Sequence, residues 1–334
     1  MLPMTSSKHF TIQELADGVY VALHRVAGLA LCNACIVDLG DQTLIFDTFL
    51  TPQAAIDLSL AAESLTDHPA SLVVNSHYHC DHTWGNQVFG PDAELICSEA
   101  TRQQIATRGV DEVRWLKENS SERAALGERT LSSWIGLDKQ ARTHPIWQSY
   151  AQAVSEALPR LRPRPPNLTF DKCLTLHGAK RSIELISYTG GHTSSDTVLW
   201  LPQESILVGG DLIYFGAHPF LGEANPIELV AILSSLRNLK PRQIIPGHGP
   251  PGTLRELAAL QDYLERLLKR ADKLLEKGVR QDKSSKLTPP AAYQDWLLDE
   301  YYPTNLRRAL QFLARERGWE VEIKATQFID YHPL

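Results

Sequence analysis

The sequence predicts a mixed α/β fold with a core of two sheets and helices outside it. Short apolar runs alternate with helical segments over the first hundred residues, and a second β-rich region begins after residue 180. A polar, helix-like stretch separates the two regions. The chain has 334 residues, 43% hydrophobic and 22% charged, which is ordinary for a globular protein and excludes disordered and collagen-like chains.

The first half reads as strands joined by tight turns. A Gly40-Asp41 pair is suited to a hairpin between two of these strands. A helix is expected at 52–65. The strands are short and rich in β-branched or apolar residues, and they are expected at about 20–25, 34–39, 43–48, 71–76 and 94–98.

The second half repeats this β-rich pattern after a helical insertion at about 99–165, which ends in the Pro-rich run 162–167. Strands are expected at 182–188, 197–202, 205–210 and 243–246. Helices are expected near 226–239, from about 253, where leucines recur on one face, and at 290–315. We therefore expect one domain at 1–252 that contains the insertion, and a C-terminal helical extension at 253–334 packed on it.

The charge and the apolar content of the chain limit the kinds of partner that are expected. The net charge is −6, with no basic stripe, so no nucleic-acid partner is expected. No apolar run approaches the ~20 residues of a membrane helix, and the N-terminus shows no secretory signal, which predicts a cytoplasmic protein. The five sparse cysteines indicate reduced thiols, and Cys32 and Cys35 are expected to be small buried residues.

The stretch 75–86 (NSHYHCDHTWGN) is the most informative part of the chain. It places His77, His79, Asp81 and His82 directly after a buried strand, where an extended segment can aim several side chains at one point. With 12 His in 334 residues, three His and one Asp at fixed positions arise by chance in roughly one chain in a thousand. Chance clustering is therefore a poor explanation.

Three later residues, His192, Asp211 and His248, each follow an apolar run and lie beside glycines. Five His and two Asp suit a pair of metal ions, and imidazole together with carboxylate favours zinc. No cysteine accompanies these three positions, which disfavours a structural zinc site built on thiolates.

At this point the pattern resembles the metallo-β-lactamase superfamily, over about residues 10–252. His77, His79, Asp81 and His82 match its H-x-H-x-D-H motif, and His192, Asp211 and His248 match its later ligand positions. The resemblance implies an αββα four-layer sandwich with a helical insertion and C-terminal helices. It also implies a first metal on His77, His79 and His192, a second on Asp81, His82 and His248, Asp211 bridging the two, and Asp47 supporting the site from behind.

The resemblance further implies a zinc-dependent hydrolase that uses a metal-bridging hydroxide on an ester, lactone, thioester or amide bond of a small molecule. Two Zn²⁺ per chain are expected, with manganese or iron as alternatives, and Asp81 or Asp211 as the catalytic carboxylate that moves the proton. Asp211 stands where β-lactamases of two classes carry Cys or Ser, and Ser195 replaces a glycine common in lactonases. A dedicated β-lactamase is therefore not expected.

Two other activities fit the same ligands. A phosphodiesterase or nuclease would need a basic exosite, and none is visible in the sequence. An iron-dependent persulfide dioxygenase would use only one ligand set. A binding-only relative is disfavoured because all seven ligand positions are filled, and a homo-oligomer is compatible with the helical segments.

Residues near the motifs carry weaker predictions. The loop 214–220 is expected near the metals, with Tyr214 binding substrate or simply packing, and His218 supporting the site or lying at the surface. Trp84 is expected to wall the pocket or pack in the core. Four arginines, expected to bind an anionic group or to face solvent, are Arg102, Arg108, Arg114 and Arg123. Histidines expected to be incidental are His9, His24, His68, His144, His177 and His332.

Overall fold

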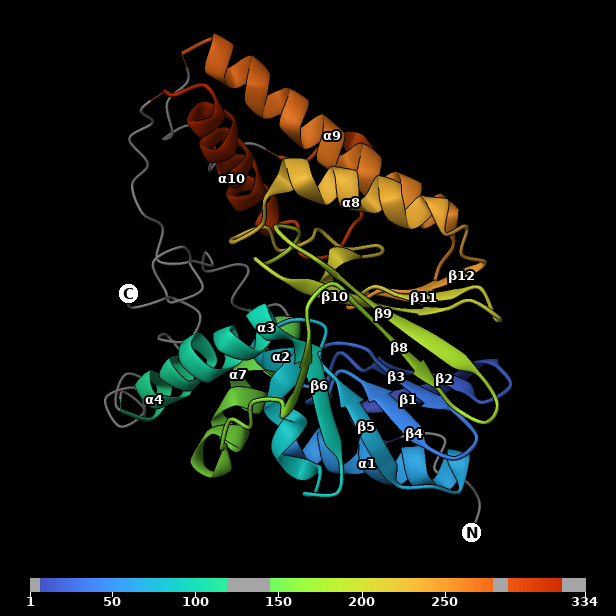
Figure 1. Ribbon diagram of the computed structural model, residues 1–334. Coiled ribbons are helices and arrows are strands. Elements are labelled where there is room, and N and C mark those ends of the chain that lie inside the picture. Colours follow the sequence, from blue (N-terminus) through green and yellow to red (C-terminus); the bar gives the residue numbers. More distant parts are fainter. Residues whose placement is uncertain (1–6, 119–144, 279–287, 320–334) are drawn as a thin grey trace.

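Two sheets lie face to face in the computed structural model, which describes residues 7–118, 145–278 and 288–319 (Figure 1). Helix α1 (Pro52–Thr66) covers the outer face of the first sheet, and helices α8 (Pro226–Asn238) and α9 (Leu254–Glu276) cover that of the second. The layers are thus helix, sheet, sheet, helix, and the predicted two-sheet α/β fold is confirmed.

The first sheet has seven strands in the order β1-β2-β3-β4-β5-β6-β7. Pairing is antiparallel from β1 to β4 and parallel from β4 to β7. The hairpin expected at Gly40-Asp41 joins β3 to β4. The strands are β1 (Phe10–Ala16), β2 (Val19–His24), β3 (Ala34–Asp38), β4 (Thr43–Phe46), β5 (Ala70–Val74), β6 (Glu94–Ser98) and β7 (Leu168–Phe170).

The second sheet has five strands in the order β12-β11-β10-β9-β8, all antiparallel except β11 with β12. Its strands are β8 (Cys173–His177), β9 (Ser182–Tyr188), β10 (Asp196–Leu201), β11 (Ile206–Val208) and β12 (Gln243–Ile245). Three strands, β1, β7 and β8, were not predicted, and each has intermediate or exposed positions that dilute the apolar pattern.

Successive side chains along a strand point to opposite faces of its sheet, so each sheet packs into two cores, one between the sheets and one under the outer helices. In β4, Leu44 and Phe46 point between the sheets, and Ile45 points toward α1. In β10, Leu199 joins the core between the sheets while Trp200 packs under the C-terminal helices. Strands buried on both faces therefore read as continuous apolar runs in the sequence.

Where the structure describes them, the insertion and the C-terminal segment are largely helical, as predicted; residues 119–144, 279–287 and 320–334 of these segments lie outside the described ranges. The insertion contains α3 (Glu99–Gln104), the π-turn η2 (Ile105–Gly109), α4 (Val110–Glu118), α7 (Pro145–Ala157) and the 3₁₀ turn η4 (Leu158–Arg160). Helix α9 begins at a Thr253–Glu256 capping box. The helix expected at 290–315 is wrong at its start: α10 spans Tyr301–Glu316, after a 3₁₀ turn η7 (Ala291–Tyr293) and a left-handed Leu298 (φ 63°) that cannot continue a helix.

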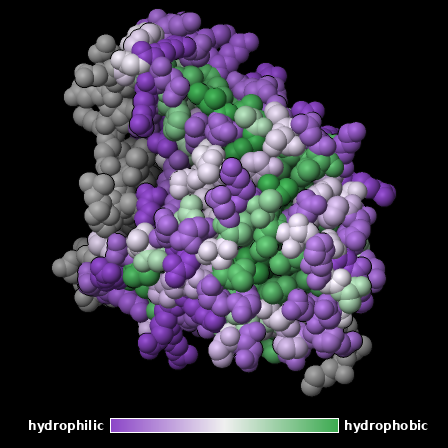
Figure 2. All heavy atoms as spheres, viewed as in Figure 1, coloured by the Kyte–Doolittle hydropathy of each residue, from purple (hydrophilic) through white to green (hydrophobic). Residues whose placement is uncertain are grey.

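Figure 2 shows one face, on which hydrophobic residues form patches over the sheets and also over helices α8 to α10, among hydrophilic residues. Over the described part of the chain, none of the helices has both the length and the apolar content to span a membrane.

Gly85 offers a test of how tightly α1 packs behind the predicted ligand motif. It lies in η1 (Trp84–Val88), where a Cβ would sit 1.9 Å from the Thr48 carbonyl oxygen and 2.6 Å from Ala55 Cβ. We expect Gly85→Ala to lower the free energy of unfolding by about 3 kcal/mol and the thermal midpoint by about 6 °C. The control, Gly90→Ala, adds a Cβ with nothing within 4 Å and should unfold like the wild type. Equal midpoints for the two variants would contradict this packing.

Candidate metal centre

Strand direction brings the seven predicted ligands to one edge of the sandwich. Strands β9 and β11 both run antiparallel to β10, and β12 runs parallel to β11, so these three strands end at the same edge. His192, Asp211 and His248 follow those ends, and His77 follows β5. Because carboxyl ends of strands that run the same way meet at one edge, residues far apart in sequence converge there.

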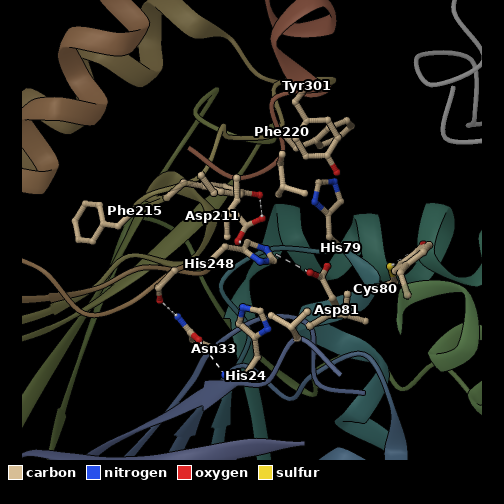
Figure 3. Close-up of a pocket in the computed structure, with 18 of the residues that line it drawn as sticks. His24, Asn33, His79, Cys80, Asp81, Asp211, Phe215, Phe220, His248 and Tyr301 are labelled. Carbon is tan, nitrogen blue, oxygen red and sulfur yellow. Dashed lines mark hydrogen bonds and ion pairs between the residues drawn. The ribbon is translucent and has the colours of Figure 1, made fainter. Parts of the chain in front are cut away.

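The seven side chains form two groups in which the ligand atoms lie within 4.8 Å of one another. One group is His77, His79, His192 and Asp211, and the other is Asp81, His82 and His248. The stick view in Figure 3 shows His79, Asp81, Asp211 and His248 turned toward a common space. The structure therefore brings together every residue that the sequence pointed to as a ligand.

Asp211 connects the two groups through its two oxygens. Its Oδ2 lies 3.5 Å from His192 Nε2 and 4.0 Å from His77 Nε2. Its Oδ1 lies 3.1 Å from His82 Nε2 and 3.3 Å from His248 Nε2. One carboxylate thus faces two pairs of imidazoles, which is the arrangement that a bridging ligand needs.

Buried atoms without hydrogen bonds show that this donor set fits metal ions. His77 Nε2, His82 Nε2 and Asp211 Oδ1 are all buried, and within the described ranges none has a hydrogen-bond partner. Buried polar atoms are normally paired, so such a cluster is suited to binding a cation. Imidazole nitrogens and carboxylate oxygens are the ligands that zinc accepts, and the residues present therefore fit the implied cofactor.

A layer of polar residues behind the ligands orients them. Asp47, which has a left-handed backbone (φ 65°), accepts hydrogen bonds from Ser76 N and Ser76 Oγ, both at 2.8 Å. His82 Nδ1 donates to Asp47 at 2.8 Å, and His77 Nδ1 lies 2.9 Å from Ser76 Oγ. With each Nδ1 engaged, the Nε2 lone pairs face the centre. Asp47 thus takes the supporting position expected of it.

Burial and neighbouring charges set the protonation states of His77, His192 and Asp81. Burial lowers the pKa of His77 well below its usual value and that of His192 to about 4, so both rings are neutral at pH 7. Burial raises the pKa of Asp81, but the charges of His82 and His248 outweigh it and lower this pKa to about 2. A neutral imidazole and an ionised carboxylate are the forms that bind a cation.

A cavity of about 560 Å³ opens in front of the ligands. Its walls include Leu116 of α4, Val154 of α7 and Leu297 before α10, so the insertion and the C-terminal segment both line it. Its charged lining residues, apart from histidines, are the acids Asp81, Glu112, Asp211 and Glu223; no lysine or arginine of the described segments takes part. The volume is typical of a small-molecule site.

The weaker predictions have mixed outcomes. The loop after Asp211 does lie at the site: Tyr214 donates to Asp211 Oδ2 at 2.5 Å, stacks on His248 and lines the cavity, as does Phe215. Trp84 packs in a buried cluster under α4 and α7, which is the core alternative. The surface alternative for His218 was wrong, because the C-terminal helices bury it against Tyr263; a supporting role stays a prediction.

The arginines of the insertion also differ from one another. Arg102 donates to the Pro166 carbonyl oxygen, and Arg114 pairs with Asp111 at the surface. Arg108 pairs with Glu223 beside the cavity. Arg123, like His144 and His332, lies outside the described residues.

His24, expected to be incidental, lies beside the ligands without belonging to either group. It lines the cavity with its ring centroid 6.2 Å from that of His248, and burial together with the His248 charge lowers its pKa to about 4. Since β2 runs the same way as β4, its last residue reaches the ligand edge, so the strand-end rule applied to the seven candidate ligands could have placed His24 there.

Other residues at the site had no sequence signal. Asn33 donates to the carbonyl oxygens of Pro246 and Gly249, on both sides of His248. Cys32, expected only to be buried, donates from Sγ to the Asp81 carbonyl oxygen. Glu223 reaches His79 from a distant loop.

Comparison with known proteins places this geometry in a family. The sequence model of the metallo-beta-lactamase superfamily matches residues 27–92 and 113–248, which include all seven candidate ligands. The chain belongs to the metallo-beta-lactamase superfamily. The predicted family and four-layer fold are thereby confirmed.

Individual relatives are distant. A linear primary-alkylsulfatase from a Pseudomonas species is 21% identical over 307 residues, which cover 85% of this chain and 55% of that protein. A type 2 metallo-beta-lactamase from Bacteroides fragilis is 29% identical over 111 residues, 31% of this chain and 45% of that protein. The chain thus spans about half the length of these relatives.

Among solved structures, a metallo-beta-lactamase from Pontibacter korlensis superposes with a TM-score of 0.53 at 18% identity, covering 77% of this chain and 99% of the other. This likeness supports the fold alone. The C-terminal helices α9 and α10 lie beyond the family match, and the division at residue 252 stays a prediction.

Proton release should accompany metal binding. Burial lowers the pKa of His248, but the Asp211 and Asp81 carboxylates outweigh it and raise this pKa to about 9, so the ring is protonated at pH 7 in the metal-free protein. A metal must displace that proton, and we expect zinc affinity to rise from pH 6 to pH 8 by up to about tenfold per pH unit for each displaced proton. Chelator competition on metal-free protein measures this, and an affinity that is flat with pH would contradict it.

Proposed function

We propose that this protein is a hydrolase that binds two divalent metal ions, with zinc as the first choice. The observation that carries the proposal is the Asp211 carboxylate, whose two oxygens face separate pairs of imidazole nitrogens. His77, His79 and His192 would hold one ion, and Asp81, His82 and His248 the other. When bound, such ions lower the pKa of water toward 7 and polarise the bond to be cleaved.

The exposure of the two acids supports Asp81 over Asp211 in the proton-moving role. The Asp211 side chain is 3% exposed, and both of its oxygens face imidazoles. The Asp81 side chain is 19% exposed and lines the cavity, so it can reach a leaving group. Tyr214, whose pKa burial and Asp211 raise well above its usual value, stays protonated and holds Asp211.

The cavity favours a substrate with an apolar body. Leu116, Val154 and Leu297 line it, and a bound apolar chain would exclude water from the metal edge. A similar protein is named a linear primary-alkylsulfatase, so alkyl sulfate esters join carboxylic esters, lactones, thioesters and amides as substrates to test. A β-lactam is disfavoured by Asp211.

The alternative of a phosphodiesterase or nuclease receives less support. The acidic and apolar lining lacks the basic side chains, over the described residues, that would neutralise a polyanion. The alternative of a mononuclear iron persulfide dioxygenase is disfavoured because the second group of ligands is complete. We accordingly propose a small-molecule substrate and, as expected from the sequence, a cytoplasmic enzyme.

Metal analysis and removal test the activity. We expect two metal ions per wild-type chain, loss of hydrolysis on chelation, recovery with zinc, and at most one tightly bound ion in Asp211→Ala. One iron per chain with oxygen consumption on a persulfide would overturn the hydrolase. Faster turnover of a phosphodiester than of any ester would favour the nuclease class.

The proposed preference for an apolar substrate is tested by varying the length of the substrate's alkyl chain. For n-alkyl sulfates and p-nitrophenyl esters, we expect kcat/KM to rise by up to about fourfold per added CH₂ until the cavity is filled. Leu297→Asp should lower kcat/KM for long chains and leave short chains unchanged, because the side chain lines the cavity and is 52% exposed. The control is Leu60→Asp, equally exposed on α1. A rate independent of chain length would contradict this assignment.

A further inference from the structure

His79 differs from its neighbours in how its ring is held. Its Nδ1 lies 3.1 Å from His192 Nε2 and so faces the first group of ligands. Its Nε2 lies 3.5 Å from Glu223 Oε1. The rings of His77 and His82 are instead oriented from behind, by Ser76 and Asp47. His79 therefore depends on a partner from a different part of the chain.

The Glu223 carboxylate is fixed by two further side chains. The Tyr78 hydroxyl donates to Oε1, and Arg108 Nη1 donates to Oε2 at 2.7 Å. Arg108 also lies 3.3 Å from the Tyr78 hydroxyl and over its ring. Both carboxylate oxygens thus accept hydrogen bonds. In the orientation that these bonds fix, Oε1 also points at His79.

The backbone that carries Glu223 is also anchored. Arg308 of α10 donates to the Glu223 carbonyl oxygen at 2.9 Å and to the Ala224 carbonyl oxygen at 2.8 Å. The C-terminal helix thereby fixes the loop from one side while Arg108 fixes the carboxylate from the other. A side chain that is held at its backbone and at its carboxylate can fix the orientation of a neighbouring group.

Arg108 comes from the π-turn η2 of the helical insertion. Such turns insert one residue into a helix and are frequent at functional sites. The Arg108–Glu223 pair is 38% and 22% exposed, so solvent screens it and its contribution to stability is small. The main effect of the pair is to fix the orientation of the Glu223 carboxylate.

We propose that Glu223 is a positioning residue for His79, and that Arg108 and Tyr78 hold it in that role. Donation of the Nε2 proton to Glu223 leaves the Nδ1 lone pair for a metal ion and makes the ring a stronger ligand. The insertion thereby acts on the first metal site without contacting it. This inference rests on the proposed function, because it needs a metal at that site.

Zinc titration of metal-free protein, with a chromophoric chelator as competitor, tests the role. We expect Glu223→Ala to weaken one of the two sites about 10- to 100-fold and leave the other unchanged, because loss of an outer carboxylate has effects of that size. Glu223→Gln keeps an acceptor for Nε2–H and should lose less than tenfold. Arg108→Met should weaken the same site, by less than Glu223→Ala.

Two controls separate orientation from general damage. Arg114→Met removes an arginine of the same insertion that is 61% exposed and pairs with Asp111, and it should titrate like the wild type. With cobalt in place of zinc, the visible spectrum of Glu223→Ala should change for the weakened site alone, while thermal unfolding of the metal-free variants stays at the wild-type midpoint.

The outcomes are distinguishable. A wild-type chain that binds no metal overturns both the proposed function and the role of Glu223. A wild-type chain that binds two ions, with Glu223→Ala unchanged or with both sites weakened equally, overturns the positioning role and leaves the proposed function standing. Loss of affinity in Glu223→Gln as large as in Glu223→Ala also contradicts orientation through an acceptor.

Discussion

The buried Asp211 carboxylate is the constraint around which this end of the molecule is organised. It lies in η5 (Gly210–Leu212), faces four imidazoles and is almost closed to solvent. A buried charge is costly unless it is paired, so its surroundings must supply positive charge at that place. Burial raises its pKa, but the charges of His248 and His82 outweigh this and hold the pKa well below its usual value. Protonated imidazoles can provide this charge in the free protein, and cations can replace them.

The backbone around Asp211 leaves little freedom to move it. A Cβ on Gly247 would lie 2.1 Å from Asp211 Oδ1, so only glycine allows the His248 loop to pass so close. Asn33 holds the same loop through two carbonyl oxygens, and Asp47 and Ser76 hold the rings on the opposite side. The geometry of the centre is therefore built into the folded chain.

The C-terminal helices α9 and α10 and the helical insertion act on the site indirectly. His218 lies against Tyr263 and the Tyr293 carbonyl oxygen, and Asn305 donates to the Pro219 carbonyl oxygen and accepts from Leu221 N. These contacts tie the loop after Asp211 to α9 and α10. The insertion supplies Leu116, Val154 and Arg108 to the cavity and its border. The helical insertion and the C-terminal helices, of which α9 and α10 lie beyond the family match, thus shape the pocket that would select a substrate.

The sequence by itself determined the two-sheet fold and the seven candidate ligands, because both are written in local patterns. Short continuous apolar runs mark the strands buried on both faces, and polar residues at strand ends converge wherever strands run the same way. His24 followed that rule too, and was overlooked only because it stands alone. Only the tertiary structure decided that Glu223 lies beside His79, that His218 is buried by the C-terminal helices, and that the cavity is apolar and acidic. These features are contacts between segments more than 40 residues apart, and no local period or spacing encodes which distant side chain will fill such a place.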